Sequence, residues 1–187
     1  MNTPNTNNYF WQGEKIRLRP MRKEDAGLWL AEDTDSEGIR TLNPGIELPK
    51  SVKDAEAFAE KYADFNNSEE RIMFSIETMD GELVGGINLN GIDQRNGIGM
   101  RLYRPFRGKG YAMEAKTILL RYAFYELRLH KYNTRCLETN EAMIRHAKRL
   151  GCQEEGRIRQ CVFTNGRYYD ALLFGFTKEE FEERDRA

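Results

Sequence analysis

Two glycines separated by one residue, Gly108 and Gly110, form the feature of this sequence with the clearest chemical meaning. They lie between a stretch with strand character and the longest amphipathic segment of the chain, residues 111–127. Glycine lets the backbone approach a ligand closely, and the unpaired N–H groups at a helix N-terminus carry partial positive charge. The turn therefore predicts an anion-binding site, for which phosphate is the natural ligand.

Basic residues surround this turn and raise its positive potential: Arg101, Arg104, Arg107 and Lys109. Two other phosphate-binding motifs do not fit. No Gly-Lys-Ser/Thr follows four variable residues, and Met113 stands where a dinucleotide fingerprint has its third glycine. A purely structural tight turn is the remaining alternative, because an isolated Gly-x-Gly is common in that role.

The elements that must position this turn follow from the periodicity of apolar residues. Strand patterns occupy 15–19, 72–78, 83–92, 98–103 and 132–137, and two more strands flank Asn165-Gly166. Helix patterns occupy 24–32, the segment after a Ser51–Asp54 capping box, 111–127, 141–150 and a short stretch from 177. Asp80-Gly81 and Asn165-Gly166 predict hairpin turns in which both central residues have positive φ. The acidic, Gly- and Pro-containing segment 33–50 is predicted to be a loop.

The composition narrows the classes of protein and partner. The chain has 187 residues, with 29 Lys and Arg against 30 Asp and Glu, for a net charge of −1. This length predicts a single domain over 14–187, preceded by a flexible polar segment over 1–13 in which Tyr9, Phe10 and Trp11 are available to dock. The balanced charge argues against a general polyanion binder, so we expect no nucleic-acid partner.

The hydropathy and the cysteines favour a cytoplasmic protein. No apolar run reaches the length of a membrane-spanning helix, and the first twelve residues lack a basic leader and an apolar run, so we expect no membrane partner. Three cysteines without a CxxC spacing favour reduced thiols over a disulfide framework. With only two histidines in the chain, we also expect no metal site.

Residues 107–112, Arg-Gly-Lys-Gly-Tyr-Ala, resemble the Q/R-x-x-G-x-G/A signature of the GNAT N-acetyltransferases. Residues 140–152, an Asn followed by a helix pattern and Leu-Gly, resemble a later segment of that family. Residues 16–20 and 165–170 are similar to the ribosomal-protein and spermidine N-acetyltransferase branch. The resemblance covers about 14–181, which is nearly the whole predicted domain.

The resemblance implies an α+β, GNAT-like fold: a central, mostly antiparallel twisted sheet of about seven strands with flanking helices, splayed near Leu102 to take acetyl-CoA. It implies contacts to the pantetheine arm from the strand before the turn, a cradle for the pyrophosphate at the turn, and a contact near the thioester. The cofactor-binding residues implied are Met100, Arg101, Leu102, Arg107, Gly108, Lys109, Gly110, Tyr111, Ala112, Met113 and Asn140. A helix cap is the alternative role for Asn140.

The positions that usually carry the family's catalytic groups hold unsuitable residues. A Tyr seven residues after the Asn is replaced by Ala147, and the other three positions hold Met143, Arg135 and Val162. The candidate substitutes are Glu77, Tyr103 and Glu138. His146 adjoins the missing Tyr, but neighbouring helical residues point about 100° apart, so we expect it to be exposed.

The resemblance implies transfer of an acetyl group from acetyl-CoA to a primary amine, such as a ribosomal-protein or peptide N-terminus, a polyamine or a small amine. The alternative is a non-catalytic acyl-CoA binding or sensing module, which the missing catalytic acid favours. The acidic residues of 32–37 would suit a polyamine or a basic peptide, although a solvated acidic loop is the simpler interpretation. The sequence leaves the acceptor open, and it leaves open whether the chain forms a homodimer.

Overall fold

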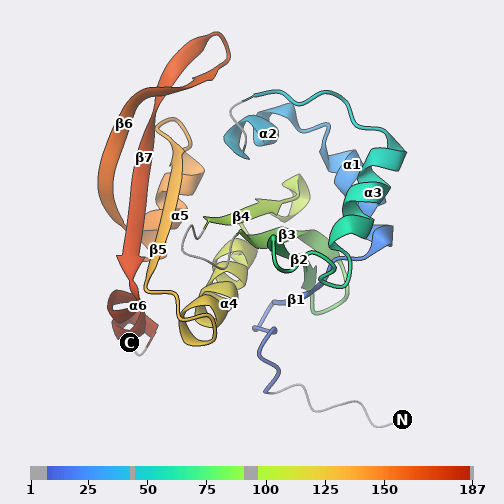
Figure 1. Ribbon diagram of the computed structural model, residues 1–187, viewed down its shortest axis with the longest axis horizontal. Helices are drawn as coiled ribbons and strands as arrows, with labels where there is room; N and C mark the ends of the chain where they lie inside the picture. The colour runs from blue at the N-terminus through green and yellow to red at the C-terminus, as the bar shows by residue number, and fades with distance from the viewer. Residues whose placement is uncertain (1–7, 43–44, 91–96, 186–187) are drawn as a thin grey trace.

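The computed structural model describes residues 8–42, 45–90 and 97–185, and its strands form two antiparallel sheets (Figure 1). The first sheet has the order β1-β2-β3-β4, with β1 (Ile16–Pro20), β2 (Arg71–Thr78), β3 (Leu83–Asn90) and β4 (Gly97–Leu102). The second has the order β5-β7-β6, with β5 (Lys131–Leu137), β7 (Arg167–Thr177) and β6 (Gln153–Thr164). The predicted α+β fold is confirmed, with its seven described strands divided between two sheets.

The helices lie close to their predicted positions, with two additions, at 36–42 and 104–106. They are η1 (Lys23–Asp25), α1 (Ala26–Glu32), α2 (Ser36–Leu42), α3 (Val52–Tyr62), η2 (Arg104–Phe106), α4 (Tyr111–Tyr125), α5 (Glu141–Arg149) and α6 (Lys178–Asp185). The prediction of a loop throughout 33–50 is wrong, because α2 lies inside it. Residues 43–44 of that loop and 91–92 of the predicted third strand lie outside the described residues.

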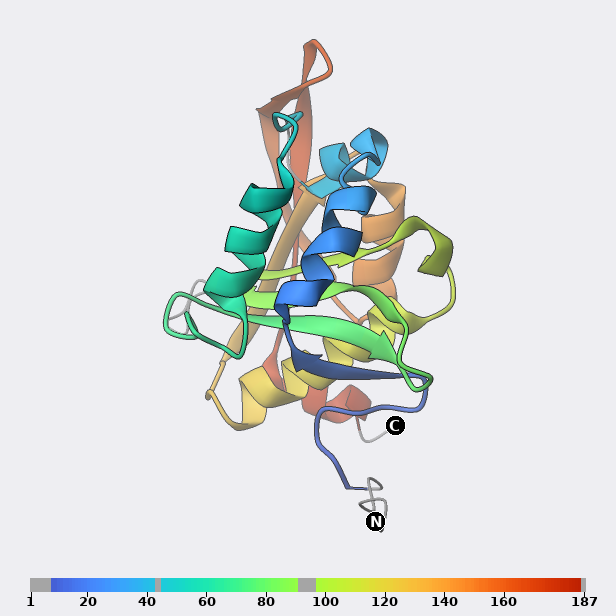
Figure 2. The same cartoon turned by 90° about the vertical axis from the view of Figure 1, so that its right-hand side faces the viewer.

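The first sheet has a helical layer on each face (Figure 2). The larger core cluster joins alternate residues of β2, such as Phe74 and Ile76, to Leu119 of α4. The smaller cluster joins Met73, which points to the opposite face of β2, to Ala59 of α3. Because side chains alternate along a strand, a strand buried on both faces lies between two layers. The α4 helix therefore lies on one side of this sheet, and α1 and α3 lie on the other.

The segment before β1 is part of the packed domain. The Trp11 ring lies 4.7 Å from the Phe74 ring and 4.8 Å from the Tyr122 ring. The Leu18 N–H donates to the Trp11 carbonyl at 2.7 Å. Trp11 is therefore docked against the core, as its aromatic side chain allowed.

The two predicted hairpin turns differ. Asn165 and Gly166 both have positive φ, at 51° and 78°, as a type I′ turn requires. In the turn between β2 and β3, Gly81 has φ 92° but Asp80 is not left-handed, so the prediction of positive φ at both residues is wrong there. The strands are joined by four residues, 79–82, so the two-residue turn geometry is not imposed. None of the helices in the described ranges combines the length and the apolar character needed to cross a membrane.

Candidate active site

A cavity of about 700 Å³ opens between the two sheets, and we call it the first cavity. Its walls come from 98–102 of β4, from 134–136 of β5, from the turn before α4 and from one face of α5. Strand β4 ends the first sheet and is paired on one side, to β3. Its other edge therefore offers backbone N–H and C=O groups that none of the described strands uses.

The glycine turn forms one end of the first cavity. Gly108 and Gly110 have φ values of 80° and 90°, in the left-handed region that glycine adopts without strain. Gly110 is the N-cap residue of α4, and it makes no side-chain cap hydrogen bond. The Met113 N–H donates to the Gly110 carbonyl at 3.1 Å, and the N–H groups before it lie at the uncapped end of α4, where an anion can bind.

The first cavity has a basic wall. One acidic residue lines it, Glu37, whereas six basic residues do. Arg101, Arg107 and Arg145 are held in ion pairs, and the lining cations without an ion pair among the described side chains are Lys116, Arg135 and Arg149. Lys116 is 1% exposed, and its ammonium lies over the Tyr132 ring, 5.8 Å from the centroid. A buried cation and a helix N-terminus both attract negative charge, so this cavity suits a ligand with several negative charges.

Most residues that the sequence proposed for the cofactor lie together in this wall. Those that line it are Met100, Arg101, Leu102, Arg107, Gly108, Gly110, Ala112, Met113 and Asn140. Lys109 and Tyr111 do not: the Lys109 ammonium lies over the Phe106 ring at 5.2 Å, and Tyr111 packs against the core. Asn140 also caps α5, since its Oδ1 accepts from the Met143 N–H at 3.0 Å.

The comparison with known proteins decides the family. A family model described as an acetyltransferase (GNAT) domain matches residues 15–153. The chain belongs to the GNAT acetyltransferase family. The SPbeta prophage-derived N-acetyltransferase YokL of Bacillus subtilis (strain 168) is 32% identical over 176 residues, which cover 92% of this chain and 96% of YokL.

Solved acetyltransferases share this fold. The microcin C7 self-immunity acetyltransferase MccE, solved with acetyl-CoA and AMP, has a TM-score of 0.74 at 21% identity, over 88% of this chain and 93% of MccE. The spermidine N-acetyltransferase of Vibrio cholerae, solved with CoA and spermine, has a TM-score of 0.76 at 21% identity, over 89% and 98%. The predicted membership of the GNAT family is confirmed by the family model and by YokL, and this GNAT protein is an enzyme with acetyl-CoA as co-substrate.

The usual catalytic positions of GNAT enzymes offer no proton donor here. Ala147 is fully buried, and Val162 lies on β6 outside the two cavities described here. Met143 and Arg135 line the first cavity, but a thioether has no proton and a guanidinium does not release one near neutral pH.

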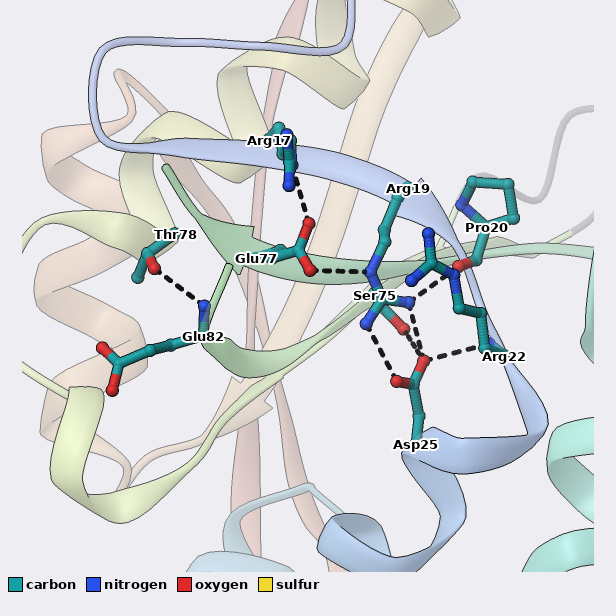
Figure 3. Close-up of polar contacts among 9 residues, drawn as sticks. All are labelled: Arg17, Arg19, Pro20, Arg22, Asp25, Ser75, Glu77, Thr78 and Glu82. Atoms are coloured by element: carbon teal, nitrogen blue, oxygen red, sulfur yellow. Dashed lines mark hydrogen bonds and ion pairs between the residues drawn. The ribbon is translucent and has the colours of Figure 1, made fainter. Parts of the chain in front are cut away.

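Two of the proposed substitutes, Glu77 and Glu138, are held in ion pairs away from both cavities. Glu77 lies between Arg17 and Arg19, at 2.7 and 3.2 Å, as Figure 3 shows. Glu138 pairs with Arg157 at 3.0 Å and accepts from the Asp170 N–H at 3.0 Å. Their oxygens are occupied by structural contacts, so we do not assign a proton-transfer role to either.

The ion pairs around Glu77 continue to Asp25 and tie β1 and β2 to η1 (Figure 3). Burial alone would raise the pKa of Asp25, but two hydrogen bonds from Arg19 at 2.9 Å and one from Ser75 at 2.6 Å hold that pKa below its usual value. This network positions the start of α1 against the sheet.

His146 lies in the wall of the first cavity, so the prediction that it is exposed is wrong. Its Nε2 is buried and has no hydrogen-bond partner in the described part of the chain. Burial and the nearby cations Lys116 and Arg149 lower its pKa to about 4, which keeps the imidazole neutral at pH 7. The sequence did contain a signal for this position of His146. His146 follows Met143 by three residues, so the two side chains lie on the same face of α5.

A second cavity, of about 380 Å³, lies across β4 from the first. Gly99, Met100 and Arg101 line both cavities, so this one strand separates them. The other walls come from α1, α2, α3, β2 and β3, and from Asp33, Glu47, Lys50 and Tyr103 between elements. Tyr103, the third proposed substitute, lies here and is 2% exposed, and burial raises the pKa of its hydroxyl. Sequence reasoning did not foresee this cavity.

Acidic residues of 32–37 are paired with basic residues. Asp33 contacts Arg101 at 2.6 Å and Lys50 at 3.3 Å. Asp35 contacts Arg107 at 2.6 Å. Their charges are largely compensated, which weakens the argument for a polyamine drawn from this segment.

Proposed function

We propose that this enzyme moves the acetyl group from acetyl-CoA, bound in the first cavity, to a primary amine. The observation that carries the proposal is that one cavity combines the left-handed glycine turn, the uncapped start of α4 and the basic wall. Coenzyme A carries a diphosphate and a further phosphate, so its charge suits this wall.

The residues of the first cavity have distinct proposed roles. Backbone N–H groups at Gly108 and Gly110 bind the diphosphate, and the buried ammonium of Lys116 adds positive charge. The free edge of β4 at Met100 to Leu102 receives the pantetheine arm. This assignment is supported by the position of β4 at the end of its sheet, next to β5 across the cavity.

The reaction requires an uncharged amine nitrogen that attacks the thioester carbonyl carbon. A C–N bond forms, the C–S bond breaks, the sulfur leaves as a thiolate that takes up a proton, and the nitrogen loses one. Ala147 supplies no proton, so we infer that the enzyme contributes chiefly by positioning the two substrates, while solvent carries the protons.

The acceptor classes that remain are protein N-termini, polyamines and small amines. Titration calorimetry with acetyl-CoA, followed by thiol release with each amine class, tests the proposal. Binding of acetyl-CoA with amine-dependent thiol release is expected. Tight binding without turnover on any amine would favour the acyl-CoA sensing module. The three free cysteines support a reducing compartment such as the cytoplasm.

A further inference from the structure

The second cavity gathers buried hydrogen-bond donors that have no partner. Five buried side-chain polar atoms in the described part of the chain lack one, and three of them belong to residues that line this cavity: Trp29 Nε1, Arg101 Nε and the Tyr103 hydroxyl. Indole and guanidinium N–H groups only donate, and the raised pKa of Tyr103 keeps its proton on the oxygen. A buried donor left unpaired costs about 1 to 3 kcal/mol, so three around one cavity indicate a ligand that accepts hydrogen bonds.

The charges that line the second cavity also favour a ligand that accepts hydrogen bonds. Its acidic groups are already engaged, since Asp33 pairs with Arg101 and Lys50, and Glu47 pairs with Lys50 at 2.7 Å. Arg71 lines the same cavity, and its guanidinium lies over the Tyr62 ring at 5.7 Å, with no ion pair among the described side chains. The interactions left for a ligand are therefore donor groups and positive charge.

The second cavity shares a wall, strand β4, with the cavity proposed for acetyl-CoA. Strand β4 separates it from the first cavity, and Gly99 places no side chain in that wall. A Cβ atom at Gly99 would lie 2.6 Å from Asn88 Oδ1, so the wall remains thin only with glycine. A ligand in the second cavity thus reaches β4 from the side opposite acetyl-CoA.

We propose that the second cavity is the acceptor site, and that its ligand is a small amine that carries a carboxylate, as an amino acid does. This inference rests on the proposed acetyl transfer. The carboxylate accepts from Trp29, Arg101 and Tyr103, and its charge is compensated by Arg71. The apolar body of the ligand packs against Phe58 and Met73, which line the same cavity. A polyamine would leave the donors unpaired and would face the same cations.

The test compares amines that differ only in the carboxylate. Thiol release is measured with acetyl-CoA and L-leucine, L-methionine or L-phenylalanine, then with the three matching carboxamides and with spermidine. Rates are expressed per neutral amine, because amidation lowers the amine pKa. We expect kcat/KM to be about 10- to 100-fold higher for a carboxylate than for its carboxamide, the effect of hydrogen bonds to a charged group.

Conservative variants test which residues bind the carboxylate. Tyr103→Phe and Trp29→Phe each remove one donor and keep a ring, and each should raise KM for the carboxylate about tenfold while the Kd of acetyl-CoA is unchanged. Tyr132→Phe is the matched control for Tyr103→Phe, because its hydroxyl is also buried without a partner but lies outside both cavities. Thermal melts identify any variant that fails to fold. If either Tyr103→Phe or Trp29→Phe does not fold, the KM of the other variant tests the inference.

The outcomes separate this inference from acetyl transfer itself. Acetylation of spermidine or of the carboxamides as efficiently as the carboxylates would overturn the inference and leave acetyl transfer standing. If no amine is acetylated, acetyl transfer is refuted. Calorimetry of the three amino acids with CoA present then tests the second cavity as a binding site, and absence of binding overturns the inference. Equal losses in Tyr103→Phe and Tyr132→Phe would also overturn it.

Discussion

Replacing Gly108 with alanine should weaken acetyl-CoA binding much more than it weakens the fold. Gly108 has φ 80°, is exposed, and would place a Cβ atom with no heavy atom within 4 Å. The substitution therefore introduces backbone strain and no steric clash. An L-residue in the left-handed region costs about 1 to 2 kcal/mol, so the free energy of unfolding should fall by that amount.

The effect on binding follows from how the chain relieves this strain. Rotation of φ at position 108 away from the left-handed region turns a backbone N–H out of the anion cradle. A hydrogen bond to a charged group contributes about 1.5 to 3 kcal/mol, so the Kd for acetyl-CoA should rise about 10- to 150-fold. Calorimetry measures the Kd, and urea unfolding measures the stability.

Gly166 provides the matched control. It has φ 78°, is exposed, would also place a Cβ atom with no heavy atom within 4 Å, and lies in the β6–β7 turn outside both cavities. Gly166→Ala should lose the same stability and bind acetyl-CoA with the wild-type Kd. Wild-type affinity in a folded Gly108→Ala protein, or the same loss of affinity in both variants, would refute the assignment of the cradle.

Four further outcomes are expected. Lys109→Ala should raise the Kd for acetyl-CoA by less than about threefold in calorimetry, since its ammonium lies over Phe106 outside the cavity wall and exposed charges are screened; a loss as large as that of Gly108→Ala would show that side-chain charge dominates. The pKa of His146 is lowered to about 4 in the folded state, so on acidification the imidazole of the unfolded state is protonated first. The stability that depends on the neutral ring is therefore present above pH 6.5 and is lost as the pH falls toward 4. In urea unfolding, the free energy of unfolding of His146→Gln should therefore fall less between pH 6.5 and 4 than that of the wild type; equal falls would contradict the lowered pKa of His146. Trp11→Ala should lower the free energy of unfolding by about 2 kcal/mol, because a half-buried ring packed against Phe74 and Tyr122 is removed; an unchanged melt would mean that the segment is not docked. With no side-chain acid at Ala147, kcat/KM should rise about tenfold per pH unit below the pKa of the acceptor amine, and a descending limb that disappears in Tyr103→Phe would identify Tyr103 as an acid.

Local sequence signals predicted the elements that depend on local contacts. The Ser51–Asp54 capping box is present as expected, with the Ser51 Oγ accepting from the Asp54 N–H at 3.1 Å and the Asp54 carboxylate accepting from the Ser51 N–H at 3.0 Å. The glycine turn was predictable for the same reason, because its positive φ angles and the start of α4 are encoded within a few residues.

Features that depend on distant contacts were not predictable. Helix α2 begins beside Asp35, which binds the Gly38 N–H at 3.1 Å and Arg107, a residue far along the chain, at 2.6 Å. The second cavity takes its donors from Trp29 on α1, Arg101 on β4 and Tyr103 beyond it, and no single motif contains them. Only the topology of the first sheet and its helices brings these side chains together.

The central claim is that the enzyme transfers acetyl from acetyl-CoA to an amine nitrogen. The most direct measurement uses acetyl-CoA labelled with carbon-13 in the acetyl group, incubated with the enzyme and, in separate reactions, L-phenylalanine, spermidine and an N-terminal peptide. The labelled product is identified by mass spectrometry and NMR. We expect one labelled acetyl group per amine, bonded to nitrogen and formed at the same rate as the CoA thiol is released. Release of labelled acetate alone, or acetyl-CoA that is bound and never consumed with any of the amines tested, would contradict it.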